Sequence, residues 1–334
     1  PTWLEGMNRM DLNIVPSNFV RDTMIGLNFD VTDKDTKQKK GELKVNKPVE
    51  VLFEGTDTNI FKKTKDFSKE LVDEMKNVEE NFNFLYVGHW LQGNLGKDRK
   101  DTGMMLKVFL ETFKNQKQKP GLIMKTSGAG FSILDREDIL SKIETVKETV
   151  KGDLPNVYLL HGDFTDEEMN ELYNHPKVKA HVNLTHGEGF GRPLLEASIS
   201  QKPIIASDWS GHTDFLFKDL AIMIKGSMSA VEKGSVPDDF LIDGSQWFTV
   251  NYRDASSAMK SVYKSYKQYT INAKKLGIVN KSKFSLNAMT RKFGKILDKY
   301  VPEFAQEVKL QLPKLKKVGS TKTPKITLPK LKKV

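Results

Sequence analysis

The chain has 334 residues, enough for one large or two modest domains. It contains no cysteine, which excludes disulfides, cysteine-bound metals and a thiol nucleophile, and which fits a cytoplasmic location. The formal net charge is +10, but residues 308–334 hold nine lysines and no acidic residue, so positions 1–307 carry about +1. The body of the chain is therefore not expected to bind nucleic acid specifically.

The chain begins with a short predicted strand, LNIVPS at 12–17, and Ser17 is a candidate N-cap for the helix that follows. Residues 30–47 are charged and poor in apolar side chains, which predicts a solvated loop or linker. Residues 48–55 then predict a strand that ends in a turn at Gly55.

Three apolar runs follow, and each has the length and composition of a buried strand: 81–90, 121–128 and 157–164. The first is followed by a loop rich in glycine and basic residues and then by a helix with apolar residues at helical spacing. Residues 133–150 predict a surface helix. Thr165 and Glu168 form a capping box at the start of another helix.

Residues 181–215 predict a strand, a loop, a helix and a second strand. HVNLT is the first strand, HGEGFG is a glycine-rich turn, Pro193 lies just inside the helix start, and KPIIAS is the next strand. The turn should therefore lie at the carboxyl edge of a parallel sheet, where such sheets bind their ligands.

Two carboxylates belong to this unit, Glu188 in the loop and Glu196 on the helix, eight positions on. The backbone amides of Phe190, Gly191 and Arg192 lie at the positive end of the helix dipole. An anion beside these amides, with carboxylates placed for hydroxyl groups, describes a sugar nucleotide. On spacing alone, a surface turn with two solvated acids remains an equal alternative.

The sequence EGFGRPLLEA, followed by KPIIASDWSG, resembles the E-x7-E signature of the group 1 family of retaining glycosyltransferases, which have the GT-B fold. Two acids at this spacing are a weak signal, but the glycines, the proline and the second strand make it strong. The resemblance implies that Glu188 contacts hydroxyls of the donor sugar as the catalytic residue and that Glu196 holds the ribose hydroxyls. It also implies that the amides after Gly189, those of Phe190 and Gly191, help to bind the diphosphate.

The same resemblance assigns the diphosphate-binding cations. The family places an arginine directly after the glycine of the first strand, but here His89 follows Gly88. A neutral imidazole cannot replace the planar fork of an arginine. Lys100 matches the second cation of the family, and Arg99 or Lys97 could compensate for the first.

Further donor contacts are implied by the family pattern. Phe164 is a candidate for contact with the nucleobase, and Gly211 would let a backbone approach the donor closely. His212 and Asp214 are expected to make structural hydrogen bonds and not to perform acid–base chemistry. No metal and no cofactor is expected, because lysine, arginine and helix amides can neutralise the leaving diphosphate.

The resemblance divides the chain into five parts. We expect a remnant of an N-terminal acceptor domain at 1–29, a polar linker at 30–47, a Rossmann-like nucleotide-sugar-binding α/β domain at 48–250, closing helices at 251–305 and a basic, disordered tail at 306–334. The roughly 150 residues that would precede this remnant in the family are absent, and we expect a truncated sequence record.

The tail repeats the sequence LPKLKKV at 312–318 and 328–334. Its prolines and alternating lysines predict an extended arm. Two interpretations are equally supported: an arm that docks on an anionic membrane surface or an acidic protein, which would make the protein peripheral at a membrane, and a disordered solubilising tail.

The function expected from these features is transfer of a hexose-type sugar from a nucleotide-diphosphate donor to a hydroxyl of a glycan, lipid or protein acceptor, with retention. This chain would hold mainly the donor site and would transfer little on its own. The alternative is a non-catalytic nucleotide-sugar-binding or scaffold protein that acts through its fold and its basic tail.

Overall fold

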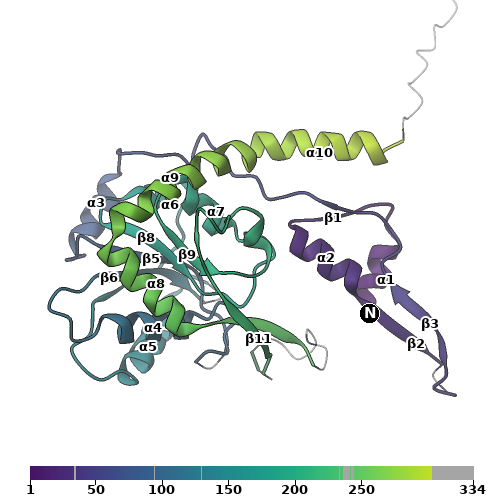
Figure 1. Ribbon diagram of the computed structural model, residues 1–334, viewed down its shortest axis with the longest axis horizontal. Helices are drawn as coiled ribbons and strands as arrows, with labels where there is room; N and C mark the ends of the chain where they lie inside the picture. Colours follow the sequence, from purple (N-terminus) through teal and green to yellow (C-terminus); the bar gives the residue numbers. More distant parts are fainter. Residues whose placement is uncertain are drawn as a thin grey trace, which may run out of the picture. The chain divides into compact units, whose positions relative to one another are not determined.

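A parallel sheet of six strands forms the centre of the protein, which is represented by a computed structural model (Figure 1). The structure describes residues 1–302 except 34, 94, 129, 233, 236–240, 242 and 243. In spatial order the strands are β10 (Ile222–Ile224), β9 (Ile204–Ser207), β8 (Val178–Asn183), β5 (Asn83–His89), β6 (Gly121–Ser127) and β7 (Val157–Leu160).

The four central strands, β9, β8, β5 and β6, are largely buried on both faces, which explains their continuous apolar runs. In β5, Phe84 and Tyr86 belong to one core cluster and Leu85 to the other, because successive side chains of a strand point to opposite faces. All three are at most 1% exposed. The α/β fold class expected from the sequence is therefore confirmed.

Helices cover both faces of the sheet. On the face of Phe84 the core includes side chains of α4 (Thr102–Phe113), α5 (Ile133–Glu148) and α8 (Tyr252–Lys264). The opposite face is covered by four helices: α3 (Lys69–Lys76), α6 (Asp166–Asn174), α7 (Arg192–Ile199) and α9 (Tyr266–Lys283). The capping box predicted at Thr165 and Glu168 is present at the start of α6.

The strand order reverses direction between β5 and β8. From β5 the chain adds β6 and β7 on one side, and it then returns to add β8, β9 and β10 on the other. In open α/β sheets such a reversal opens a crevice outside the carboxyl ends of the two strands, and ligands bind there. The loops that follow β5 and β8 carry six of the predicted donor residues, Arg99, Lys100, Glu188, Gly189, Phe190 and Gly191.

Residues 1–51 contain α1 (Thr2–Asn8), β1 (Asn13–Val15), α2 (Asn18–Gly26), β2 (Asn28–Thr32), β3 (Lys39–Lys44) and β4 (Val49–Val51). The predicted N-cap is confirmed, since the Ser17 side chain accepts a hydrogen bond from the backbone of Val20. β1 and β4 form a two-stranded parallel sheet.

Residues 30–47 contain most of a β-hairpin and are not the irregular loop that their composition predicted. β2 and β3 pair antiparallel, and the Lys39 ammonium lies 2.6 Å from the Asp30 carboxylate on the other strand. The hairpin has no buried residue, and its short alternating run, with Phe29 and Val31 in β2, lies among charged residues that are typical of a loop. Its backbone ladder and cross-strand ion pairs hold it instead.

The last part of the described chain contains the antiparallel pair β11 (Gly226–Ala230) and β12 (Gln246–Val250), then α8, α9 and α10 (Leu286–Tyr300). α10 contacts β4: Lys299 and the Tyr300 hydroxyl both donate to the Glu50 carboxylate at 2.8 Å. An apolar stripe of α10 stays partly exposed, since Leu286, Phe293 and Leu297 are 38–39% accessible.

Residues Pro1–Tyr300 form one compact unit, and the finer division at 29, 47 and 250 stays a prediction. The predicted basic tail, with both copies of LPKLKKV, lies outside the described residues. Within the described part of the chain, no helix combines the length and the apolar character that crossing a bilayer requires.

Truncation of Phe109 tests the packing of the central sheet. Phe109 is fully buried against Phe84 and Phe113. We expect Phe109→Ala to lower the free energy of unfolding in urea by about 3–5 kcal/mol. Phe131→Ala is the control, because Phe131 is 47% exposed and its truncation should lower the free energy of unfolding far less. Equal losses in the two variants would contradict this description of the core.

Candidate donor-binding cleft

Two loops meet at the reversal point, residues 90–101 after β5 and residues 184–191 after β8. Arg99 makes three of the hydrogen bonds that join them: its carbonyl accepts from the His186 amide at 3.1 Å and from the Thr185 hydroxyl at 3.3 Å, and its guanidinium donates to the Gly187 carbonyl at 3.0 Å. The loops therefore position their side chains relative to each other.

Lys100 and Glu188 form an ion pair between these loops. Each side chain is only 10% exposed. Burial lowers the pKa of Lys100, while the Glu188 carboxylate acts in the opposite direction. Arg99 lies 3.7 Å from the same carboxylate. The structure thus brings together two of the residues predicted to handle the donor.

The loop that carries Glu188 is hydrogen-bonded to the residues that follow β9. The Glu188 amide donates to the Ser210 hydroxyl at 2.8 Å, and the Gly211 amide donates to the Glu188 carbonyl at 2.9 Å. A Cβ atom at Gly211 would lie 2.0 Å from the Gly189 carbonyl oxygen. Gly211 does allow a close backbone approach, and the backbone that approaches it is the loop itself.

The segment before α7 combines a buried anchor with free backbone amides. The Phe190 side chain is 2% exposed and packs on Phe215, so it belongs to the core. Gly191 has φ +95°, in the left-handed region that favours glycine. Among the described residues, nothing accepts a hydrogen bond from the Phe190 and Gly191 amides. Both residues are buried, so their amides are two polar groups without a partner in the described protein, at a helix start of the kind that attracts anions.

Glu196, on α7, is 6% exposed and has two protein partners. Its carboxylate accepts from Arg192 Nε at 2.8 Å and from the Tyr173 hydroxyl at 3.4 Å. Burial raises the pKa of Glu196 to about 7, although the Arg192 guanidinium favours the ionised form. Near neutral pH this carboxyl group can therefore both accept and donate a hydrogen bond.

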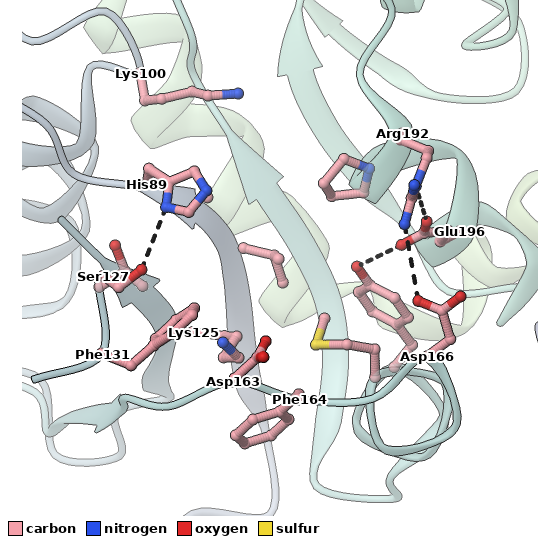
Figure 2. Close-up of a pocket in the computed structure, with 16 residues that line it drawn as sticks. His89, Lys100, Lys125, Ser127, Phe131, Asp163, Phe164, Asp166, Arg192 and Glu196 are labelled. Carbon is pink, nitrogen blue, oxygen red and sulfur yellow. Dashed lines mark hydrogen bonds and ion pairs between the residues drawn. The ribbon is translucent and has the colours of Figure 1, made fainter. Parts of the chain in front are cut away.

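A cleft of about 240 Å³ opens beside these residues. Figure 2 shows Lys100 and His89 on one side of it, Arg192 and Glu196 on the other, and Lys125 with Phe164 further along. It is lined by Val87, Gly88, His89, Lys100, Lys125, Thr126, Ser127, Phe131, Asp163, Phe164, Asp166, Met169, Tyr173, Arg192, Pro193 and Glu196.

Five of the predicted donor residues line this cleft: Gly88, His89, Lys100, Phe164 and Glu196. The other six, Arg99, Glu188, Gly189, Phe190, Gly191 and Gly211, lie in the adjoining loops and do not line it. The Arg99 side chain is directed at Gly187 and Glu188, so it does not offer its guanidinium to the cleft as compensation for His89. His89 itself is hydrogen-bonded to the Ser127 hydroxyl at 3.2 Å.

Sequence reasoning missed Lys125, which lies beside Phe164. The Lys125 ammonium is 4.6 Å from the centre of the Phe164 ring and donates to the Gly162 carbonyl at 2.7 Å. Burial lowers the pKa of Lys125. The signal was present in the sequence, because this lysine interrupts an otherwise apolar strand near its carboxyl end. The Arg192 side chain was also missed, although it lies four positions before Glu196.

His212 and Asp214 make separate structural hydrogen bonds. His212 Nε2 donates to the Ser207 carbonyl at 2.6 Å. The Asp214 carboxylate accepts from the Asn18 backbone and side-chain amides, at 2.9 and 3.1 Å.

The start of α2 also contacts the loop that carries Glu188. The Ser17 hydroxyl donates to the Gly189 carbonyl at 2.6 Å. The start of α2 is thus bonded to the donor loop itself.

No group of three or more His, Asp or Glu side chains is arranged to hold a metal ion in the ranges that the structure describes. The cations of the cleft are Lys100, Lys125 and Arg192, and its acids are Asp163, Asp166 and Glu196. This mixture suits a ligand that carries both negative charge and hydroxyl groups.

The raised pKa of Glu196 predicts a pH-dependent stability term. Between pH 4.5 and about 7 the folded state keeps the Glu196 proton, whereas the unfolded state has released it, so the free energy of unfolding falls as pH rises through this window. The full contribution of Glu196 to the free energy of unfolding is at most about 3 kcal/mol. We expect Glu196→Gln to lack this decline, as measured by urea unfolding at several pH values. Parallel curves for the two proteins would contradict the assignment.

No family model matches the sequence, and no curated protein matches it. Solved structures do match the fold. Anabaena HepE in complex with UDP and glucose matches with a TM-score of 0.61 and 12% identity, over 89% of this chain and 66% of that chain. A glycosyltransferase from Rickettsia africae matches with a TM-score of 0.57 and 15% identity, over 90% and 67%.

Sucrose-phosphate synthase from Thermosynechococcus elongatus matches with a TM-score of 0.59 and 14% identity, over 89% of this chain and 60% of that chain. This chain thus spans 60–67% of the length of these three structures. At such low identity the similarity concerns the fold alone. The chain has the Rossmann-like α/β fold of the GT-B glycosyltransferases.

Proposed function

We propose that this chain is the donor-binding part of a glycosyltransferase that transfers a hexose-type sugar from a nucleoside diphosphate to an acceptor hydroxyl with retention. The observation that carries the proposal is the cleft at the strand reversal, where Lys100 and Glu196 face each other across a gap and Glu188 is ion-paired to Lys100. Solved structures of this fold include one that holds UDP and glucose.

In this proposal the diphosphate binds beside Lys100 and the free amides of Phe190 and Gly191. A cation and preorganised N–H groups stabilise the negative charge that develops on the leaving diphosphate, so no metal ion is required. When the diphosphate binds, Lys100 leaves Glu188 and pairs with the diphosphate, and the Glu188 carboxylate accepts hydrogen bonds from hydroxyl groups of the sugar. Each of these largely buried charges then keeps a partner.

Glu196 and Lys125 would bind the nucleoside. The largely buried carboxyl group of Glu196 can accept and donate hydrogen bonds, which suits the two hydroxyls of a ribose. Phe164 and the Lys125 ammonium lie at the far part of the cleft and offer a ring face and a hydrogen-bond donor to a base. The acceptor would be a glycan, lipid or protein bound mainly by surfaces outside this chain.

A second function, binding of a nucleotide sugar without transfer, is favoured by one observation. His89 occupies the place of the expected arginine, and Arg99 is bonded to Gly187 and does not line the cleft. The diphosphate would then meet one cation fewer, which weakens stabilisation of the leaving group more than it weakens binding of the sugar nucleotide.

Calorimetry with UDP and GDP tests donor binding. We expect Lys100→Gln to weaken binding of the preferred nucleotide by roughly 10- to 150-fold, because a hydrogen bond to a charged group contributes about 1.5–3 kcal/mol. Lys97→Gln is the matched control from the same loop, since Lys97 pairs with Glu232 and does not line the cleft. Lys100→Gln/Glu188→Gln removes the ion pair as a unit and controls for an unpaired Glu188.

The proposal fails if neither nucleotide binds the wild-type chain, or if both lysine variants bind equally well. Assays of transfer and hydrolysis with a nucleotide sugar then separate the two functions. Binding without any turnover, even when the acceptor-binding part is supplied, favours the non-catalytic function. Efficient turnover by residues 1–334 alone would show that the acceptor site is also in this chain.

A further inference from the structure

Helix α9 has one face built for the core and one for the solvent. Its inner face is buried: Ala273, Leu276 and Asn280 are at most 2% exposed, and Gly277 is buried beside them. The Asn280 side chain donates to the Ser198 hydroxyl of α7 at 2.8 Å. A Cβ atom at Gly277 would lie 2.7 Å from the Ser198 carbonyl, so the two helices approach closely. This inner face fixes which residues of α9 point outward.

The outer face exposes two large aliphatic side chains, Ile271 and Ile278, which are 58% and 63% accessible. They are seven positions apart and so lie on one stripe of the helix. The same helical spacing places four exposed lysines beside them, Lys267, Lys274, Lys275 and Lys281. α9 contains five lysines in all and no acidic residue.

The helical region that contains α9, residues 252–300, carries a large excess of positive charge. Residues 252–300 contain twelve Lys and Arg and two Asp and Glu, a formal charge of +10, whereas residues 1–251 carry −7. None of the α9 lysines forms an ion pair with any residue that the structure describes. The positive charge of α9 is therefore not neutralised by neighbouring side chains of the described chain.

We propose that the outer face of α9 (Figure 1) binds an anionic membrane surface, with the lysines at the lipid headgroups and Ile271 and Ile278 inserted at the boundary of the acyl chains. Apolar side chains of a peripheral protein can enter the acyl boundary while neighbouring lysines stay at the headgroups. In α9 both kinds of side chain lie on the outer face, because the inner face is packed in the core. Anionic lipid attracts each nearby lysine. A purely electrostatic partner, such as nucleic acid or an acidic protein surface, would give no role to the two isoleucines.

Another helix of the chain shows that exposed aliphatic residues alone do not make such a surface. At the start of α5, Ile133 and Leu134 are 79% and 82% accessible, more than the isoleucines of α9. They are followed by Asp135, Glu137 and Asp138, which anionic lipid would repel. α5 therefore supplies a control with the same apolar exposure and the opposite charge. The proposal for α9 does not depend on the sugar-donor function of the cleft.

Sedimentation with vesicles tests the proposal in the full-length chain. Vesicles of phosphatidylcholine alone are compared with vesicles of phosphatidylcholine and phosphatidylglycerol in equal parts. We expect binding to the second kind only. Lys274→Gln/Lys275→Gln should weaken it roughly 30-fold, because each lysine contributes about 1 kcal/mol and 1.4 kcal/mol is tenfold. Lys117→Gln/Lys151→Gln removes two exposed lysines elsewhere and should change little.

The isoleucines separate lipid from other anionic partners. Ile271→Ser/Ile278→Ser should weaken vesicle binding about tenfold or more, whereas Ile133→Ser/Leu134→Ser should not. Because the chain has no cysteine, Ile278→Cys can carry a single polarity-sensitive dye. Its emission should shift to the blue on anionic vesicles, and a dye at Ile133→Cys should not respond.

Three results would overturn the proposal. Absence of vesicle binding by the wild-type chain excludes it directly. Wild-type binding by both α9 variants would assign any membrane attachment to the lysine-rich residues 308–334, which every variant retains. In the third case the lysine variant loses binding, the isoleucine variant binds normally and the dye does not shift. This result would indicate an electrostatic surface for an acidic macromolecule instead.

Discussion

The ion pair between Lys100 and Glu188 is the contact on which the cleft depends. These residues come from loops on opposite sides of the strand reversal, 88 positions apart in the chain. Either charge alone would pay a large desolvation cost at 10% exposure, and the pair offsets that cost within the protein. The Arg99 guanidinium adds a hydrogen bond to the Gly187 carbonyl, so the contact between the two loops does not rest on the ion pair alone. The loops can therefore stay together when Lys100 and Glu188 turn to a ligand.

The cleft and the outer face of α9 divide the chemistry of the chain between two regions. The cleft mixes cations and acids, as a ligand with phosphates and hydroxyls requires, whereas α9 has cations and aliphatic residues but no acid. Both regions are built on the same helix, because α7 carries Glu196 on one side and contacts α9 through Ser198, two positions on, on another side. A protein with both properties would handle an activated sugar close to a lipid surface.

Local features of the sequence predicted much of this structure. Ser17 and Thr165 cap their helices as expected, since capping depends on residues three positions apart. The buried strands were recognisable from their apolar runs. The hairpin of β2 and β3 was not, because it has no buried face. The cleft position of Lys125 and the turn of Arg99 away from the cleft depend on contacts between segments distant in the sequence, which no local pattern contains.

The start of α2 has a mechanical consequence for the loop that carries Glu188. Ser17 is bonded to the Gly189 carbonyl, and Asn18 is bonded twice to Asp214, on the neighbouring loop. Phe19 adds an edge-to-face contact with Trp209, at 5.3 Å between ring centres. A displacement of α2 would have to break these bonds or drag the loop with it. Residues near the beginning of the chain therefore tether this loop, through a hydrogen bond that spans 172 positions of the sequence.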